Sequence, residues 1–448
     1  MLTMSDVLTR IYNSFDPDNP LPANDPAYVE CGEVRGENNI LKDLGNGIRR
    51  SEDKATCQLY VGHRGAGKST ELLRLKQDLE EKGCFVVYFA ADAEDVDPED
   101  AEYVDVLLAC TRHLLEELKA ADAQPLRSWL RDRWRSLEDL MLTEISFDEL
   151  KAEAQLSQFG KLSTAIRATP TERQKIRQQV NPHTPSLIDA LNQFIADAKK
   201  KLPNGKTQLV VIADNLDRIV PIPDATGRTN HDHIFLERSG QLKALKCHLI
   251  YTVPISMFYS SRANDLKDTY GNAQVLPMIM VRTKEGSIHP SGFEKIKEVI
   301  VRRIRAATAG TTYEQASIDQ EILESAEVIE QLCLMSGGHI RELVRLCKEA
   351  SNNVDELPIT AKAARRAITV VRDTYRRTVQ SNQWALLANV AVNYRCPHDE
   401  AYRELLYSRC ILEYRYFDDD DEMQCWYDVH PLIKGIDEFK SALQKVKQ

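Results

Sequence analysis

The sequence lacks the features that mark several classes of protein. Among its 448 residues, no apolar run approaches the roughly 20 residues that span a bilayer, and its start has no basic segment followed by a continuous apolar core. The ten cysteines include no Cys-x-x-Cys pair and no companion histidine at metal-binding spacing. These absences predict a cytoplasmic chain with reduced thiols, no contact with a membrane and no cysteine-bound metal.

The sequence also lacks an excess of positively charged residues. Lysine and arginine number 58 against 68 aspartate and glutamate residues, which gives a net charge of −10 at pH 7. Such a balance opposes a surface that is basic overall, although it leaves room for one basic face. Internal repeats are absent, and the only low-complexity tract is Asp418–Asp421. The hydrophobic content of 43% over this length predicts two or three globular domains.

The stretch "GHRGAGKST" follows a short apolar run and precedes a helical pattern. Its spacing is that of a phosphate-binding P-loop, in which glycines let backbone N–H groups approach a polyphosphate at the start of a helix. Lys68 is expected to reach the β- and γ-phosphates, and the Ser69 hydroxyl to bind Mg²⁺. The predicted nucleotide-binding residues are Gly62, His63, Arg64, Gly65, Ala66, Gly67, Lys68, Ser69 and Thr70.

Two aspartates near a second apolar run complete the predicted site. The run "LVVIAD" predicts a buried strand that ends at Asp214, and a carboxylate at that place would hold Mg²⁺ beside Ser69. Asp217 follows three residues later. It either orients or deprotonates the attacking water, or it pairs with Arg218 in a loop.

Alternating apolar runs and helical patterns predict an α/β fold with a doubly wound parallel sheet. A continuous helix is expected over 234–245 and the last strand of the sheet over 273–281. Two helices and two strands around an acidic turn give the C-terminal part the outline of a winged helix. The predicted divisions are a lead-in over 1–50 on the adenine side, a P-loop core over 51–289 with a helical insertion over about 120–200, a helical lid over 290–375 and a winged-helix domain over 376–448.

The motifs "GHRGAGKST", "VVIADNLDR", "LIYTVP" and "SGGHIRELVRL" occur in this order along the chain. In that respect the sequence resembles AAA-type P-loop ATPases, in particular the signal-transducing STAND and KAP-like branches and the origin-recognition-like branch. The likeness covers roughly residues 20–440. It implies ATP and Mg²⁺ as ligands, ATP hydrolysis, a homo-oligomer, a protein partner supplied in trans and a role in bacterial antiphage defence.

The resemblance also implies roles for single residues. Thr252 matches a sensor of the γ-phosphate, although a buried strand threonine bonded to backbone fits it equally. Arg341 matches a lid arginine that reaches the γ-phosphate, with a solvated helix residue as the alternative. Arg262 stands where an arginine finger acts on a neighbouring subunit, and Arg238 is the rival candidate. For both of these, an ordinary surface arginine is the other interpretation.

One departure from the pattern concerns the rate of hydrolysis. Asn215 follows Asp214 where many hydrolytic relatives carry glutamate as the base. This departure predicts slow hydrolysis. The stretch "DNLDR" resembles the "DDLDR" form of KAP-like proteins, which would move the base role to Asp217.

Two functions of different classes follow from these features. The preferred one is an ATP-driven conformational switch that acts on a protein partner. The other is a DNA-binding initiator or loader that uses the winged helix. The acidic wing tip over 417–422 would repel a phosphate backbone and favours the switch, while a helix that carries five arginines over 365–377 keeps DNA as an alternative. A small-molecule kinase is disfavoured by the additional lid and winged modules.

Overall fold

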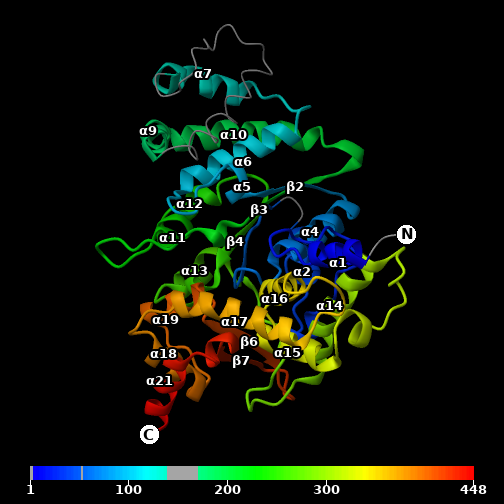
Figure 1. Cartoon of the computed structure of the whole chain (residues 1–448). Helices are drawn as coiled ribbons and strands as arrows, with labels where there is room; N and C mark the ends of the chain where they lie inside the picture. The colour runs from blue at the N-terminus through cyan, green and yellow to red at the C-terminus, as the bar shows by residue number, and fades with distance from the viewer. Residues whose placement is uncertain (1–3, 52–53, 139–169) are drawn as a thin grey trace.

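A five-stranded parallel sheet forms the centre of the molecule. The computed structural model describes residues 4–51, 54–138 and 170–448 (Figure 1). The strands lie in the order β2-β3-β4-β1-β5, and every neighbouring pair is parallel. The predicted α/β class with a parallel sheet is therefore confirmed. The strands are β1 (Cys57–Gly62), β2 (Cys84–Ala90), β3 (Gln208–Asp214), β4 (His248–Pro254) and β5 (Gln274–Leu276).

Helices cover both faces of this sheet. Alternate strand residues enter different hydrophobic clusters: Tyr60 and Val210 belong to one, whereas Leu59 and Val211 belong to the other. Burial on both faces explains why the strands form continuous apolar runs in the sequence. The first cluster includes buried leucines of α4 (Lys68–Glu81), and the second includes apolar residues of α6 (Tyr103–Glu117), α10 (Thr184–Lys200) and α12 (Ser239–Leu242).

The segment predicted as a helical insertion has two parts. In Figure 1, α7 (Gln124–Glu138) lies farthest from the sheet, and α9 (Pro170–Val180) and α10 lie between α7 and the sheet. Asn192 of α10 fixes that position, because its side chain donates to the Ala244 carbonyl at 2.9 Å and accepts from the Lys246 N–H at 2.8 Å. The helical pattern expected over 147–166 lies outside the described residues.

The remainder of the chain forms a helical lid and a C-terminal domain. In the lid, α14 and α16 pack against the N-terminal helix α1. The C-terminal domain contains four helices and an antiparallel hairpin, and it lies at the opposite end of the molecule from α7 (Figure 1). These elements are α1 (Met4–Ser14), α14 (Pro290–Thr308), α15 (Ala326–Ser336), α16 (Ile340–Asn352), α17 (Ala361–Thr378), α18 (Trp384–Asn393), α19 (Glu400–Tyr407), β6 (Ile411–Phe417), β7 (Met423–Val429), α20 (Pro431–Lys434) and α21 (Asp437–Lys447).

The β6–β7 hairpin packs directly on the core of the sheet. Leu412, Tyr414 and Trp426 are buried in the same cluster as Tyr60 and the leucines of α4. The hairpin therefore belongs to the hydrophobic core around the P-loop as well as to the C-terminal domain.

Two predicted elements differ from the structure. The prediction of a last strand over 273–281 is wrong beyond Leu276, where β5 ends. Pro277 has no N–H group to donate to a neighbouring strand. The next N–H group, that of Met278, donates to the Glu413 carbonyl at 3.0 Å and not to a strand of the parallel sheet. The continuous helix expected over 234–245 is also wrong. A π-helical turn over His233–Glu237 ends at Arg238, whose backbone angles are not helical. A separate short helix, α12, begins at Ser239 and contains Gly240, a residue of low helix propensity. No helix in the described part of the chain is long and apolar enough to cross a membrane.

Candidate nucleotide-binding site

The P-loop connects β1 to α4, as the sequence predicts. Gly65 and Gly67 have φ angles of 87° and 110°, in the left-handed region that favours glycine. A Cβ added to Gly65 would lie 2.7 Å from the His339 ring and 2.8 Å from Cβ of Arg341. Glycine at 65 thus permits the backbone conformation of the loop and the close approach of the lid.

A cavity of about 400 Å³ lies beside this loop. Its volume is within the usual range for small-molecule sites. The P-loop, the ends of β2 and β3, the N-terminal segment and the lid each contribute to its wall. The lining residues are Asp16, Pro17, Asp18, Asn19, Pro20, Arg64, Gly65, Gly67, Lys68, Ser69, Thr70, Leu73, Tyr88, Ala90, Asp92, Ala93, Asn215, Asp217, Arg218, Arg303, Ile340, Arg341 and Val344.

Lys68 and Asp217 form a buried ion pair in this cavity. The Lys68 ammonium lies 2.9 Å from a carboxylate oxygen of Asp217 and donates to the Gly62 and His63 carbonyls at 2.9 Å each. Burial alone would raise the pKa of Asp217, but Lys68, Arg218 and Arg64 together hold it below the usual range. A carboxylate with a lowered pKa suits the orientation of a water molecule better than the removal of its proton.

Ser69 and Asp214 supply oxygen atoms that fit a magnesium ion. Asp214 is fully buried, accepts from the Tyr88 hydroxyl at 2.8 Å and from the Asn215 N–H at 2.7 Å, and also bonds the Ser69 hydroxyl. Burial, and secondly the charge of Asp217, raise the pKa of Asp214, so a bound dication would stabilise its ionised form. The described residues contain no cluster of three or more metal-ligating side chains. Mg²⁺ at a P-loop needs none, because phosphates and waters complete its shell.

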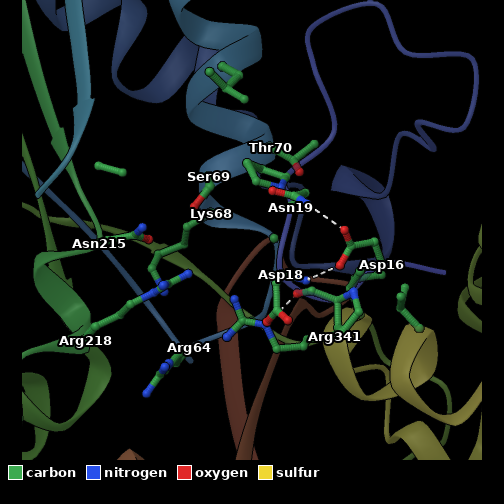
Figure 2. A pocket seen from close by; sticks show the side chains of 18 of the residues that line it. Asp16, Asp18, Asn19, Arg64, Lys68, Ser69, Thr70, Asn215, Arg218 and Arg341 are labelled. Carbon is green, nitrogen blue, oxygen red and sulfur yellow. Dashed lines mark hydrogen bonds between the residues drawn. The ribbon is translucent and has the colours of Figure 1, made fainter. Parts of the chain in front are cut away.

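Three arginines line the end of the cavity beside Lys68 and Asp217, which we call the phosphate end because it borders the P-loop. Figure 2 shows Lys68, Arg218 and Arg341 extending from different elements toward the same region, whereas the Arg64 side chain, which also lines the cavity, points away from them in this view. Arg218 pairs with Asp92 at 2.7 Å, whereas neither Arg64 nor Arg341 forms an ion pair in the described parts of the chain. Burial, together with the charges of Arg218 and Arg64, lowers the pKa of Arg341 to about 10. This end of the cavity therefore carries positive charge that an anion would neutralise.

The opposite end of the cavity is formed by the N-terminal segment and the lid. Asp16 accepts from the Asp18 N–H at 3.1 Å and from the Asn19 side chain at 2.6 Å, which folds the segment into a tight turn (Figure 2). Arg303 of α14 donates to the Ser14 carbonyl at 2.6 Å, and its Nε has no partner within the described residues. The apolar side chains here are those of Leu73, Ile340 and Val344.

Seven residues expected at the site or weighed for it do not line this cavity: Gly62, His63, Ala66, Asp214, Arg238, Thr252 and Arg262. Asp214 lies directly behind the wall, because it bonds the lining residues Ser69 and Tyr88. The Thr252 hydroxyl accepts from the Leu216 N–H at 3.0 Å and so supports the loop that carries Asp217. Arg262 pairs with Asp265 at 3.1 Å at another surface, and the Arg238 guanidinium lies 5.1 Å from the ring of Tyr103. The roles predicted for these residues remain predictions.

Several residues that line the cavity were not predicted as site residues from the sequence, and two charged ones are Asp92 and Arg303. Asp92 follows β2 and holds Arg218, and Arg303 lies on the lid helix α14. Neither belongs to a motif. The single available signal was the position of Asp92 at the carboxyl end of a predicted strand, where ligands of parallel sheets bind.

The C-terminal domain contacts the loops that surround the phosphate end. The His63 ring nitrogen Nε2 accepts from the Glu413 N–H at 3.2 Å, and the Tyr407 hydroxyl donates to the Arg218 carbonyl at 3.2 Å. Burial and the charge of Lys68 lower the pKa of His63 to about 3, so the ring is neutral at pH 7. From the lid, His339 Nε2 donates to the Arg64 carbonyl at 2.8 Å.

Solved structures that are similar to this chain match it over almost its whole length. No protein-family model matches the sequence, and no curated protein matches it. Among solved structures, the ORC2 protein of Aeropyrum pernix in its ADPNP–ADP complexes is 11% identical with a TM-score of 0.41, and covers 97% of this chain and 98% of its own. The ORC1 protein of the same organism in complex with DNA gives 11% and 0.39, with coverage of 97% and 96%.

A third similar structure is the Walker-type ATPase PABY2304 of Pyrococcus abyssi, at 13% identity and a TM-score of 0.38, which covers 96% of this chain and 99% of its own. All three TM-scores lie below 0.5. The function is accordingly proposed from the residues of this chain.

Proposed function

We propose that the chain binds ATP with Mg²⁺, hydrolyses it, and uses the nucleotide state to change its contacts with a protein partner. The observation that carries the proposal is the approach of Lys68 and three arginines to one cavity beside a P-loop. Two of these arginines, Arg64 and Arg341, have no carboxylate counter-ion in the described part of the chain. A polyphosphate is the class of ligand that satisfies such a site.

The proposed chemical step is attack of water on the γ-phosphorus. The water oxygen forms the new P–O bond, the bond to the β–γ bridging oxygen breaks, and that oxygen keeps the electron pair as ADP leaves. The proton of the water passes to the phosphate product or to solvent. Lys68 would bind the β- and γ-phosphate oxygens, and Asp217 would orient the water. Mg²⁺, held beside Ser69 and Asp214, would neutralise charge on the phosphates.

The nucleotide state would reach the C-terminal domain through two loop contacts. The P-loop bonds Glu413 through His63, and the turn that carries Asp217 bonds Tyr407 through the Arg218 carbonyl. Both loops lie where a γ-phosphate would bind. Loss of that phosphate would therefore change what the C-terminal domain packs against.

A protein partner and further copies of the chain are the proposed recipients of this change. The exposed turn over 418–422 is acidic, and Phe417 and Met423 flank it with 37% and 55% of their surfaces exposed. Apolar side chains beside an acidic turn suit a protein surface better than a phosphate backbone. The proposed role in antiphage defence rests on the motif resemblance alone.

Calorimetry with ATP, ADP and Mg²⁺, followed by phosphate release, tests the nucleotide function. We expect ATP binding by the wild type and phosphate release that Lys68→Ala abolishes. Absence of ATP binding at protein concentrations up to about 100 μM would overturn the proposal, since a P-loop site of this charge should bind more tightly. Capture of partners from lysate with ATP against ADP, followed by mass spectrometry, tests the second half.

A DNA-binding initiator is the second candidate, and one helix favours it. On α17, Lys362, Arg365 and Arg366 are exposed and form no ion pair in the described residues. Arg372 is different, because it donates to the Leu432 carbonyl and is partly buried. The three exposed cations would contact backbone phosphates without reading sequence.

Fluorescence anisotropy with a duplex oligonucleotide at several salt concentrations separates the two candidates. We expect weak binding, because the net charge of −10 and the acidic turn oppose a phosphate backbone. Replacement of the four aspartates of Asp418–Asp421 by serine should disturb partner capture. Tight, ATP-dependent and steeply salt-sensitive binding by the wild type would favour the initiator, with Arg365→Ala lowering the salt slope.

A further inference from the structure

Three observations place Arg218 at the phosphate end of the cavity. It directly follows Asp217, the partner of Lys68, in a short 3₁₀ turn at the end of β3. Its guanidinium lines the same cavity as Lys68 and Arg341 (Figure 2). Its carbonyl accepts from the Tyr407 hydroxyl. Position and charge therefore place this side chain within reach of a γ-phosphate bound by Lys68.

Asp92 fixes both the turn and the arginine. One carboxylate oxygen accepts from Nη1 of Arg218 at 2.7 Å, and the other accepts from the Asn215 side chain at 2.8 Å. The Asp92 side chain is 16% exposed and that of Arg218 is 22% exposed, so the pair is shielded from solvent on most sides. A guanidinium held by one of its nitrogens keeps further N–H groups for a phosphate oxygen.

Arg64 adds a second cation, and within the described residues no carboxylate pairs with it. It lies in the P-loop itself, and its backbone is held by the lid, because its carbonyl accepts from His339. It lines the same cavity as Arg218, and burial, followed by the charges of Arg218 and Arg409, lowers the pKa of Arg64.

The arginine expected to act on a neighbouring subunit has a different environment. Arg262 lines a separate cavity of about 320 Å³ with Arg228 and Arg403. Its guanidinium lies 3.1 Å from Asp265 and 3.5 Å from Glu237, two carboxylates that already balance its charge.

We propose that Arg218, with Arg64 beside it, supplies the arginine charge for ATP hydrolysis in cis, so that a single chain contains the complete site. This inference rests on the proposed ATPase function. In the reaction, the γ-phosphate bond to the bridging oxygen breaks while water bonds to phosphorus, and the Arg218 N–H groups donate to the oxygens that gain charge. Asp92 is a positioning residue, since it acts through Arg218.

Single-turnover hydrolysis with enzyme in excess tests this assignment. We expect Arg218→Ala to slow the chemical step by about 100-fold or more, which is typical of losing one charged donor, with ATP affinity changed by less than about fivefold. Arg305→Ala is the matched control, because Arg305 is an exposed arginine bonded to the Glu314 carbonyl outside the cavity. Arg64→Ala should give a smaller loss.

Asp92→Asn distinguishes positioning from general support of the fold. It should slow the step in the wild-type background and have no further effect in the Arg218→Ala background, because both changes remove the same contact. Additive effects with lowered melting temperature would show that Asp92 stabilises the loop alone.

Mixing two inactive variants separates action in cis from action in trans. Lys68→Ala keeps Arg218 but lacks the phosphate lysine, and Arg218→Ala keeps the lysine but lacks the arginine. If Arg218 acts within its own chain, the mixture stays inactive, and the turnover of the wild type per chain is constant on dilution. Activity recovered in the mixture, turnover that falls on dilution, or a wild-type rate in Arg218→Ala would overturn the inference.

The outcomes for the two proposals are distinct. A wild type that does not bind ATP refutes the proposed function itself. A wild type that binds ATP without releasing phosphate refutes the cis arginine and the ATPase step, while nucleotide binding stands. A wild type that hydrolyses ATP but loses its rate in Arg262→Ala, and not in Arg218→Ala, shows that the arginine comes from a neighbouring subunit.

Discussion

The two ends of the nucleotide cavity are built on different principles. The phosphate end is made mainly by loops at the ends of parallel strands, with Arg341 added from the lid, and its side chains are charged: Lys68 pairs with Asp217, and Arg218 pairs with Asp92. The other end is made by the turn over Asp16–Asn19 and two lid helices, with apolar side chains and backbone carbonyls. The sheet thus fixes the phosphate end, whereas the other end depends on how the lid packs on the N-terminal segment.

We therefore expect the two ends to make different contributions to nucleotide binding. Charged groups at the phosphate end would contribute most of the binding energy, and the lid end would add a smaller, apolar contribution that distinguishes a nucleoside from bare phosphate. Variants at the two ends should therefore differ in size of effect and in which ligands respond.

Lys68→Ala should have the largest effect. Its ammonium bonds the Gly62 and His63 carbonyls and Asp217, and its loss would remove charge-assisted bonds to two phosphates. We expect affinity for both ATP and ADP to fall by about 100-fold or more by calorimetry. Lys76→Ala, on the same helix and paired with Glu80, is the control. Unchanged affinity would mean that the loop holds no phosphate.

Asp214→Asn should have the next largest effect, restricted to experiments with magnesium. The carboxylate beside Ser69 would act on the ion through its water shell, and loss of such a group typically costs about 10- to 100-fold in metal-dependent affinity. ATP affinity measured in EDTA should remain the same or increase, since one buried negative charge is gone. Equal losses with and without Mg²⁺ would show that Asp214 supports the loop geometry instead.

Arg341→Ala should affect the choice between nucleotides. Its guanidinium approaches the phosphate end from the lid, where a third phosphate would be its partner. We expect ADP affinity to be retained and the preference for ATP to fall by about tenfold, the value of one charge-assisted bond. Arg345→Ala, one turn later and paired with Glu342, is the control. If both nucleotides lose affinity equally, Arg341 shapes the lid and does not distinguish them.

Val344→Ala should have the smallest effect and should test the lid end. Removing two buried methyl groups from the cavity wall is expected to weaken ATP and ADP alike by about three- to tenfold. Inorganic tripolyphosphate, which has no nucleoside, should bind equally to the variant and the wild type. Val299→Ala, buried on α14 outside the cavity lining, controls for lost lid stability. A loss of tripolyphosphate affinity would contradict the assignment of the two ends.

The sequence predicted most of the phosphate end because its parts are local. The P-loop residues are contiguous, and Asp214 follows an apolar run whose carboxyl end must face the loop in a parallel sheet. The partners that complete the site come from distant segments. Asp92 and Arg218 are 126 residues apart, and no motif around Asp92 indicates that they meet.

The lid end of the cavity and the contact between the hairpin and the P-loop could not be predicted either, because their residues are also far apart in the sequence. Glu413 meets His63 across 350 residues of sequence, and Arg303 lies in a helix whose pattern predicts only amphipathic packing. The early end of β5 also depends on a distant partner. After Pro277, the Met278 N–H donates to the Glu413 carbonyl of the hairpin and does not pair with β1. Local patterns do not specify such long-range partners.

The β6–β7 hairpin makes assembly of the P-loop core depend on the order of synthesis. Polypeptides emerge from the ribosome N-terminus first, at about 5–20 residues per second. The P-loop strand is therefore made several hundred residues before Leu412, Tyr414 and Trp426, which bury the same cluster as Tyr60. Until these residues emerge, one face of the sheet stays partly exposed to water. Translation that stops before residue 411 would leave a chain with an apolar surface open to chaperones and to aggregation.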